Sequence, residues 1–315
     1  MKASIIVCTR DRCVRLEALL ASLAAAKPAA GMDLELVVVD DGSRDATGVT
    51  VKRFAASAAF PVHLLQPPGR GLAAARNRGL REARGDLIIF LDDDCVVSAN
   101  YFREVAARFA ADDRPVFRGG RVMLGDPADA PLTIKTSPYA ERLDERADPG
   151  GFILGCNMAM PRAVLAKVGL FDERFGAGAL LKSAEDTDYM LRVSLAGIRV
   201  EYVPDMTVYH HHGRRTAADV RRVHRNYGIG NGALAVKHLF SAPWLWRSRY
   251  WTLRNAMKEM FGGPRFDPEL GLSHAPIVAH YAIGAGLFLF AKLRRASPWR
   301  EPVDLEMVKA PARVA

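Results

Sequence analysis

The chain has 315 residues and a net charge of +9, and 50% of its residues are hydrophobic and 25% are charged. This is the composition of a folded globular protein, and it excludes a disordered tail or a fibrous repeat. The four cysteines (Cys8, Cys13, Cys95 and Cys156) form no C-x-x-C pair, which argues against a structural zinc site and predicts free thiols in a reducing compartment.

Strands and helices are predicted to alternate along the first hundred residues. In chain order, the apolar patterns predict a strand at 4–8, a helix at 15–26, a strand at 34–43, a helix at 46–56, a strand at 62–65, a helix at 71–85 and a strand at 86–97. This alternation is typical of βαβ units and predicts an α/β fold with a mostly parallel sheet.

Long loops are predicted next, before regular structure returns. Residues 112–151 are rich in Pro, Gly and Asp, which favours loops. The later elements are, in order, a strand and then a helix within 151–172, a loop at 175–183, a helix at 184–197 and two short strands within 198–213.

Polar residues follow three of the predicted strands at the point where each strand ends. They are Thr9-Arg10, Asp40-Asp41 and Asp92-Asp93-Asp94. The carboxyl ends of parallel strands meet at one edge of a sheet, where ligands bind in folds of this class. The sequence therefore predicts a ligand site at this edge.

The three consecutive acids at 92–94 repel one another, and they stay ionised at low cost only beside a cation or in open water. Mg²⁺ and Mn²⁺ prefer oxygen ligands and often bind through carboxylates together with substrate phosphates. The triplet therefore predicts a divalent metal beside a phosphate, and a solvated acidic turn is the alternative that the run alone leaves open.

Three more groups of polar residues are candidates for chemistry. Glu185-Asp186, at the start of the helix predicted at 184–197, could supply a general base or could cap the helix. Side chains alternate along a strand, so only part of His210-His211-His212 could join a metal site, and an exposed strand end is equally open. Arg76 and Arg78 could face phosphates or solvent.

Several well-known motifs are absent from the sequence. No G-x-G-x-x-G follows a strand, which argues against a Rossmann dehydrogenase. No G-x-x-x-x-G-K-[ST] or G-x-S-x-G is present, which argues against a P-loop and an α/β-hydrolase.

Six segments resemble, in their order and spacing, the motifs of glycosyltransferase family 2. They are SIIVCTRDR, ELVVVDDGSRDAT, GLAAARNRGL, GDLIIFLDDDCVV, GCNMAMPRAVLAKVGLFDERF, and AEDTDYMLRVSLAGIRVEYVPD with a histidine after it. The resemblance covers residues 3–213. It implies a GT-A fold, a mixed central sheet with helices on both faces, and the inverting transfer of a sugar from a nucleoside diphosphate.

The resemblance also implies roles around the nucleotide sugar. Thr9 and Asp41 match positions that contact the nucleobase and its ribose. Arg10 and Arg76 are predicted to join them at the nucleotide sugar, as are Asp92 and Asp93.

A metal site and a catalytic base are implied in the same way. Asp92 and Asp94 match the ends of the D-x-D signature, with Asp94 as the main ligand of Mn²⁺ or Mg²⁺, and His210 matches a histidine that often completes this site. Asp186 matches the acid taken as the base, with Glu185 as the fallback.

The predicted function is the transfer of one sugar at a time to a sugar or lipid-linked acceptor, in cell-envelope, exopolysaccharide or glycolipid synthesis. Processive synthases of the family carry Q-x-x-R-W, which residues 220–232 lack. Two alternatives stay open: a sugar-phosphate nucleotidyltransferase, and a non-catalytic membrane-surface scaffold with a vestigial nucleotide site.

The chain is predicted to divide at residue 213. Residues 1–213 would form the GT-A domain, with a nucleotide-sugar half (1–97) and an acceptor half (98–213), and residues 214–315 a basic, mainly helical extension. Residues 1–209 hold 27 Lys/Arg and 28 Asp/Glu, whereas residues 210–315 hold 17 and 7. The excess positive charge therefore lies in the C-terminal third.

This extension is predicted to contact an anionic membrane from the cytoplasmic side. It combines basic residues with the Trp- and Arg-containing segment 242–251 and the apolar stretch 277–291. A packed helical cap is the alternative, and a nucleic-acid partner is not expected. The 15-residue apolar stretch predicts no membrane span, and the short apolar run at 5–8 predicts no secretory signal.

Overall fold

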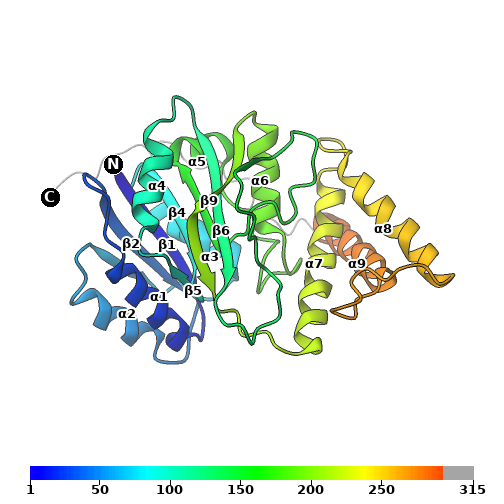
Figure 1. The fold of residues 1–315 in the computed structure, drawn as a ribbon, viewed down its shortest axis with the longest axis horizontal. Helices are drawn as coiled ribbons and strands as arrows, with labels where there is room; N and C mark the ends of the chain where they lie inside the picture. Colours follow the sequence, from blue (N-terminus) through cyan, green and yellow to red (C-terminus); the bar gives the residue numbers. More distant parts are fainter. Residues whose placement is uncertain (294–315) are drawn as a thin grey trace.

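A computed structural model describes residues 1–293, which form a mixed nine-stranded sheet with helices on both faces and three more helices at one end (Figure 1). The strands are β1 (Lys2–Thr9), β2 (Asp33–Asp40), β3 (Val62–Leu65), β4 (Leu87–Asp92), β5 (Cys95–Val97), β6 (Val116–Leu124), β7 (Glu141–Arg142), β8 (Asn157–Pro161) and β9 (Arg199–His210). Their order across the sheet is β3-β2-β1-β4-β8-β6-β9-β5, and β7 also pairs with β9.

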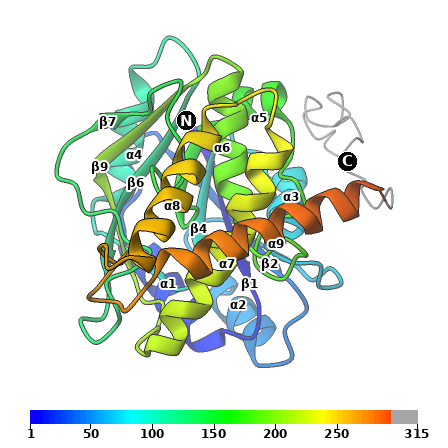
Figure 2. The same ribbon diagram turned by 90° about the vertical axis from the view of Figure 1, so that its right-hand side faces the viewer.

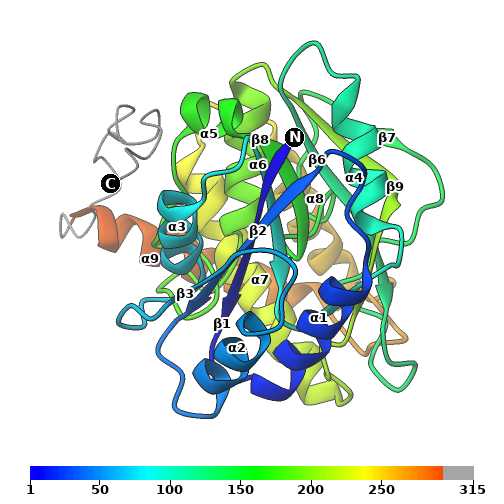
Figure 3. The ribbon, with the colours of Figure 1, turned by 90° about the vertical axis from the view of Figure 1, so that its left-hand side faces the viewer.

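The helices divide between the sheet and the C-terminal end. They are α1 (Cys13–Ala25), α2 (Thr47–Ala55), α3 (Leu72–Glu82), α4 (Tyr101–Ala110), α5 (Arg162–Val168), α6 (Glu185–Leu195), α7 (Ala217–Lys237), α8 (Leu245–Met260) and α9 (His274–Leu293). Figure 3 shows α1 and α2 against one face of the β1–β3 edge and α3 on the opposite side.

The central strands are buried on both faces, which explains their continuous apolar sequences. β1 pairs in parallel with β2 and β4, and β2 pairs in parallel with β3. Side chains alternate between the faces, so Ile5 packs with α1, α2 and α4, whereas Ile6 packs with α3, α5 and α6. The predicted α/β class, with helices on both faces of a mixed sheet, is confirmed.

Three of the predicted elements differ in the structure. The strand predicted at 86–97 is broken at Asp93-Asp94: β4 ends at Asp92, and β5 leaves its neighbour and pairs antiparallel with β9 at the far edge of the sheet. The predicted loop region 112–151 contains the nine-residue strand β6. Parallel pairing with β9 stabilises β6. Because β9 is distant in sequence, the residues around β6 carry no local pattern that would predict this strand.

The two strands predicted within 198–213 are a single strand, β9. The register between β6 and β9 shifts between Gly120 and Val122, and this irregularity accommodates Pro204 within the continuous strand. The strand therefore runs on to His210 at the carboxyl end of the sheet.

The C-terminal region is helical, as predicted, and packs against the rest of the chain. Phe175, Leu181 and Leu191 form a core with residues of α7, α8 and α9. Helices α7 and α9 approach closely because glycines face each other: a Cβ on Gly232 would lie 2.1 Å from the Tyr281 carbonyl oxygen, and one on Gly284 would lie 1.9 Å from the Ile229 oxygen. Figure 2 shows α8 and α9 lying over α7 on the side away from the sheet.

Helix α9 is longer than the apolar stretch in the sequence indicates. Its residues His274–Ala291 are long and apolar enough to cross a membrane by length and composition alone, with a mean hydropathy of 1.4. The prediction that no segment reaches this length is therefore wrong, because three residues before Ile277 extend the helix. About a quarter of the stretch, 28%, is buried inside the structure.

Candidate active site

A cleft of about 390 Å³ opens at the carboxyl ends of β1, β2 and β4, where the first residues of α6 and the end of β9 also meet. The structure brings all ten predicted site residues to its wall: Thr9, Arg10, Asp41, Arg76, Asp92, Asp93, Asp94, Glu185, Asp186 and His210. The prediction that these strand ends meet at one edge of the sheet is thus confirmed.

Asp94 and His210 meet because β5 crosses to β9. Cys95 lies opposite His210 in the β5–β9 register, and His211 donates its backbone N–H to the Asp94 carbonyl. The Asp94 Oδ1 lies 3.2 Å from His210 Nε2. Burial opposes protonation of His210, but the Cys156 sulfur and the Asp94 carboxylate outweigh it and raise the pKa of His210 to about 9.

Arg12 holds two of the three acids in place. Its Nη1 lies 3.0 Å from both Asp93 Oδ1 and Asp94 Oδ2. Burial would raise the pKa of Asp94, but His210 and Arg12 hold it well below its usual range. Burial raises the pKa of Asp93 to about 6, although Arg12 opposes this shift.

Asp94 and His210 fit the requirements of a divalent cation. Asp94 Oδ1 is buried and faces His210 Nε2 at 3.2 Å. His210 Nδ1 lies 3.1 Å from the Thr133 carbonyl, to which it would donate, and this orients Nε2 towards Asp94. The ligand atoms of Asp94, Cys95 and His210 lie within 4.8 Å of one another. A carboxylate oxygen suits Mn²⁺ or Mg²⁺, whereas the neighbouring Cys95 thiol donates to the Cys156 carbonyl, and its raised pKa disfavours the thiolate that a metal would need.

Glu185 and Asp92 share the guanidinium of Arg76. Arg76 is buried on α3 and donates to Glu185 Oε1 at 2.9 Å, to Asp92 Oδ1 at 3.2 Å and to the Gly155 carbonyl at 2.9 Å. Burial and the charge of Asp186 raise the pKa of Glu185 to about 7, against the effect of Arg76. Of the two candidates on α3, Arg76 is thus engaged with carboxylates, and Arg78 is exposed.

Asp186 is half-buried and opens into the cleft from the first turn of α6. Its Oδ2 accepts the Gly155 N–H at 2.9 Å, and its Oδ1 accepts the Thr187 N–H at 2.7 Å. Ala184, just before the pair, has a left-handed φ of +69°, an unusual conformation for a residue with a Cβ. These contacts fix the direction of the carboxylate.

Thr9, Arg10 and Asp41 form the opposite end of the cleft. Asp41 is buried and accepts the backbone N–H groups of Arg70 and Gly71, both at 2.9 Å, so it also shapes the loop before α3. Thr9 is buried with its hydroxyl oxygen unpaired within the described chain. Arg10 is exposed beside them.

The sequence did not identify several residues that line the cleft. Arg12 follows β1 and could have been found by the same strand-end argument as Arg10. Thr133 comes from a loop with no motif, and Arg214 and Tyr227 come from the segment after β9. Nothing in their local sequence indicates that they reach the acids.

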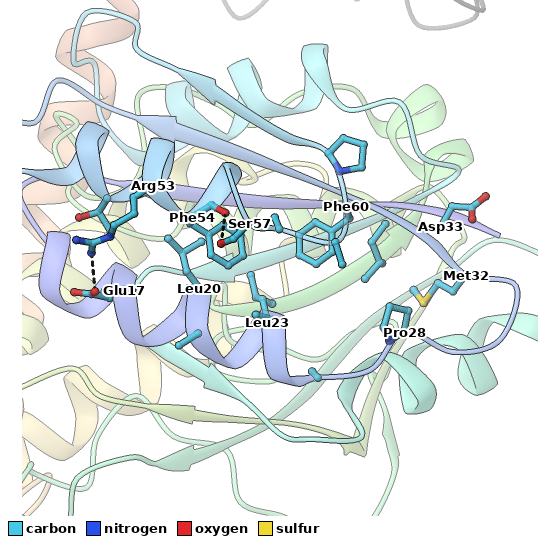
Figure 4. A pocket seen from close by; sticks show the side chains of 18 residues that line it. Glu17, Leu20, Leu23, Pro28, Met32, Asp33, Arg53, Phe54, Ser57 and Phe60 are labelled. Atoms are coloured by element: carbon cyan, nitrogen blue, oxygen red, sulfur yellow. Dashed lines mark hydrogen bonds and ion pairs between the residues drawn. The ribbon is translucent and has the colours of Figure 1, made fainter.

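A second hollow, of about 610 Å³, lies between α1 and α2 on the other side of the sheet (Figure 4). Leu20, Leu23, Phe54 and Phe60 line it, and an Arg53–Glu17 ion pair at 2.7 Å closes one end. This hollow has none of the buried acids of the cleft, so the cleft is the candidate active site.

Comparisons with known proteins identify the family of the chain. The model of "Glycosyl transferase family 2" matches residues 4–169, and that of "Glycosyl transferase family group 2" matches residues 87–289. A pre-mycofactocin glycosyltransferase of Mycobacterium tuberculosis is 28% identical over 219 residues, which are 65% of this chain and 43% of that protein. The probable glycosyltransferase YdaM of Bacillus subtilis is 28% identical over 54% of this chain and 41% of its own. The chain thus spans less than half the length of these curated relatives.

Solved structures show the same fold. A mannosyltransferase of Pyrobaculum calidifontis, in complex with GDP-Man and Mn²⁺, superposes with a TM-score of 0.58 at 20% identity, over 95% of this chain and 81% of that one. S. aureus TarS 1-349, in complex with UDP-GlcNAc, gives 0.56 at 18% identity over 95% and 93%. The expected GT-A fold is confirmed, and the first family model covers more than half of the sequence. The chain therefore belongs to glycosyl transferase family 2.

Proposed function

We propose that this protein is a metal-dependent inverting glycosyltransferase that moves a sugar from a nucleoside-diphosphate sugar to an acceptor hydroxyl. The observation that carries the proposal is the convergence of Asp94, His210 and Asp186 on one cleft from three distant parts of the chain. Family membership supports the reaction class, and the complexes of similar structures with UDP-GlcNAc and GDP-Man support the donor class.

The donor is proposed to lie with its nucleoside towards Thr9, Arg10 and Asp41, and with its diphosphate towards Asp92–Asp94. Asp94 and His210 would hold Mn²⁺ or Mg²⁺. When bound, this cation would offset the negative charge that develops on the departing diphosphate. The close approach of the Asp94 carboxylate and the His210 imidazole supports this role, as does the Mn²⁺ in one similar structure.

Asp186 is proposed as the general base. The acceptor oxygen attacks the anomeric carbon and its proton passes to Asp186, while the bond from that carbon to the diphosphate oxygen breaks. Attack from the face opposite the leaving group inverts the anomeric centre. Two backbone N–H groups hold the carboxylate, which favours a fixed direction of proton transfer.

Glu185 is proposed as a positioning residue, with the base role only as the fallback. Its carboxylate is buried and bonded to Arg76, which also holds Asp92 and the Gly155 carbonyl. Since the Gly155 N–H binds Asp186, this network supports both the donor end and the base end of the cleft.

The acceptor is proposed to be a sugar or a lipid-linked molecule at the cytoplasmic face of a membrane, in cell-envelope or polysaccharide synthesis. Tyr227, Asn226 and Val223 bring α7 of the extension to the cleft wall, so residues 214–293 have a place beside the acceptor. The Q-x-x-R-W motif is absent from 220–232, which supports transfer of one sugar at a time.

Thermal unfolding with a panel of nucleoside diphosphates, with and without Mn²⁺ or Mg²⁺, tests the proposal. One nucleotide should raise the Tm strongly, and only with metal. Its sugar conjugate should then release a nucleoside diphosphate, not pyrophosphate, when an acceptor is supplied. The absence of stabilisation by any nucleotide and metal pair would contradict the proposal.

A further inference from the structure

Helix α8 carries an apolar stripe that faces away from the rest of the chain. Its members are Trp246, Tyr250, Leu253, Met257, Met260 and, just after the helix, Phe261. All six are exposed, from 40% for Trp246 to 90% for Phe261. At about 100° per residue, the helix places them within a sector of roughly 100°, so they form one continuous strip.

The buried side of α8 is a different strip. Leu245, Arg249 and Ala256 face the interior, where Arg249 binds Asp148 and lies over the Tyr281 ring. The helix is thus already anchored to α7 and α9 through this side. The exposed strip is not needed for that packing, and its apolar character requires another explanation.

Basic residues border the apolar stripe on one flank. Arg247 and Lys258 are exposed, and Arg254 lies over the Trp251 ring at 4.8 Å. The one acidic residue of α8, Glu259, is half-buried and accepts the His274 backbone N–H at 2.8 Å. The outward surface of α8 is therefore apolar on one side and positively charged on the other, and both sides carry aromatic rings.

We propose that this face of α8, defined as Trp246, Tyr250, Leu253, Met257, Met260 and Phe261 with its basic flank, lies on an anionic membrane surface. Apolar side chains would enter the boundary between headgroups and acyl chains, Trp and Tyr rings would occupy the headgroup level, and the basic residues would contact lipid phosphates. Figure 2 shows α8 on the outer side of the helical end, where a flat surface can reach it.

The charge of this face argues against a second copy of the chain as the occupant. A twofold interface brings the same patch of both subunits together, so the three basic residues of one copy would meet those of the other without an acidic partner from α8. An anionic lipid surface is complementary to the same charges. The inference rests on and deepens the proposed function, because it holds the extension, whose helix α7 lines the cleft, at the membrane proposed to carry the acceptor.

Flotation of the full chain with vesicles, in the absence of donor and acceptor, tests the inference. The wild type should float with phosphatidylglycerol-containing vesicles and to a lesser extent with phosphatidylcholine vesicles. Its binding to the anionic vesicles should weaken as salt rises, without complete release. Replacing Tyr250, Leu253 and Met257 by Ser should lower vesicle binding at least about tenfold. The same change at Val14, Val49 and Tyr139, which are exposed elsewhere, should leave it unchanged.

Two further measurements keep the outcomes separate. Replacing Arg247, Arg254 and Lys258 by Gln should remove the preference for anionic vesicles. Brominated lipids should quench Trp246 and Trp251 in the wild type. The inference would be overturned if the Ser variant floated as well as the wild type. It would also be overturned if the wild type did not float and light scattering instead showed a dimer that the Ser substitutions disrupt. Donor hydrolysis in solution reports on the proposed reaction alone, so either proposal can fail without the other.

Discussion

Replacing Asp186 by Asn is the most direct test of the proposed base. The carboxylate accepts the Gly155 N–H through Oδ2 and the Thr187 N–H through Oδ1. An Asn side chain keeps one acceptor oxygen, but its amide nitrogen faces the other N–H, so one hydrogen bond is lost. Since the group is half-buried, this should lower the free energy of unfolding by about 1 kcal/mol, or no more than about 4 °C in Tm.

The effect on turnover should be far larger. Loss of a general base typically slows the chemical step about 10²–10⁴-fold, and that is the expected fall in kcat for Asp186→Asn. Nucleotide affinity should stay within about threefold, because the proposed nucleotide contacts are other residues. The assay is release of nucleoside diphosphate at saturating donor and acceptor, with a thermal-shift titration for affinity.

Asp113→Asn is the matched control, since Asp113 is exposed and far from the cleft wall. It should leave both kcat and affinity unchanged. If Asp186→Asn turns over within about threefold of the wild type, Asp186 is not the base, and Glu185 becomes the next candidate. A large fall in nucleotide affinity would instead indicate that Asp186 contacts the donor.

Three other changes have defined outcomes. Asp94→Ala should abolish the part of nucleotide stabilisation that depends on metal, measured as Tm with and without chelator; retained metal dependence would contradict the ligand assignment. Folding raises the pKa of Glu185 from its usual 4.5 to about 7, so its contribution to stability is complete below pH 4.5 and is lost as pH rises through 7. Glu185→Gln should therefore flatten the denaturant-measured stability between these values, and an unchanged pH profile would refute the shift. Arg76→Met leaves Glu185 and Asp92 without their cation and should lower the free energy of unfolding by about 3–5 kcal/mol; a loss below 1 kcal/mol would show that the pairs contribute little.

The position of the cleft could be predicted from the sequence because its acids follow the apolar runs of β2 and β4. Asp41 follows β2 and Asp92 ends β4, and the continuous apolar residues of these strands require burial on both faces. Parallel pairing then brings those ends to one edge. The position of His210 could be predicted only through the family resemblance, because β5 meets β9 across more than a hundred residues of chain.

The partners of charged residues could not be read from the sequence. Arg76 has the same helical spacing as a solvated arginine, and only the tertiary fold brings Glu185 to it. Helix α8 presents the same difficulty, because its buried side and its exposed apolar stripe lie next to each other, and the sequence pattern does not indicate which of the two packs against the protein. Arg249 is buried and Tyr250 is exposed, which inverts the order expected from polarity, because Asp148 and Tyr281 bind the arginine.

The buried charges beneath α6 make this helix depend on the C-terminal extension. Asp188 is fully buried two residues after Asp186, and its Oδ1 lies 2.7 Å from Lys237 Nζ and 2.8 Å from His238 Nε2, both from the end of α7 and the residue after it. Arg192 is its other cationic neighbour. A protein truncated at residue 213, the predicted domain boundary, would lose Lys237 and His238, which hold Asp188 Oδ1, and would keep only the pairing of Asp188 with Arg192. Expression of the first 213 residues alone would therefore weaken the helix that carries Asp186, and measurements on that fragment would underestimate both the stability and the proposed activity of the full chain.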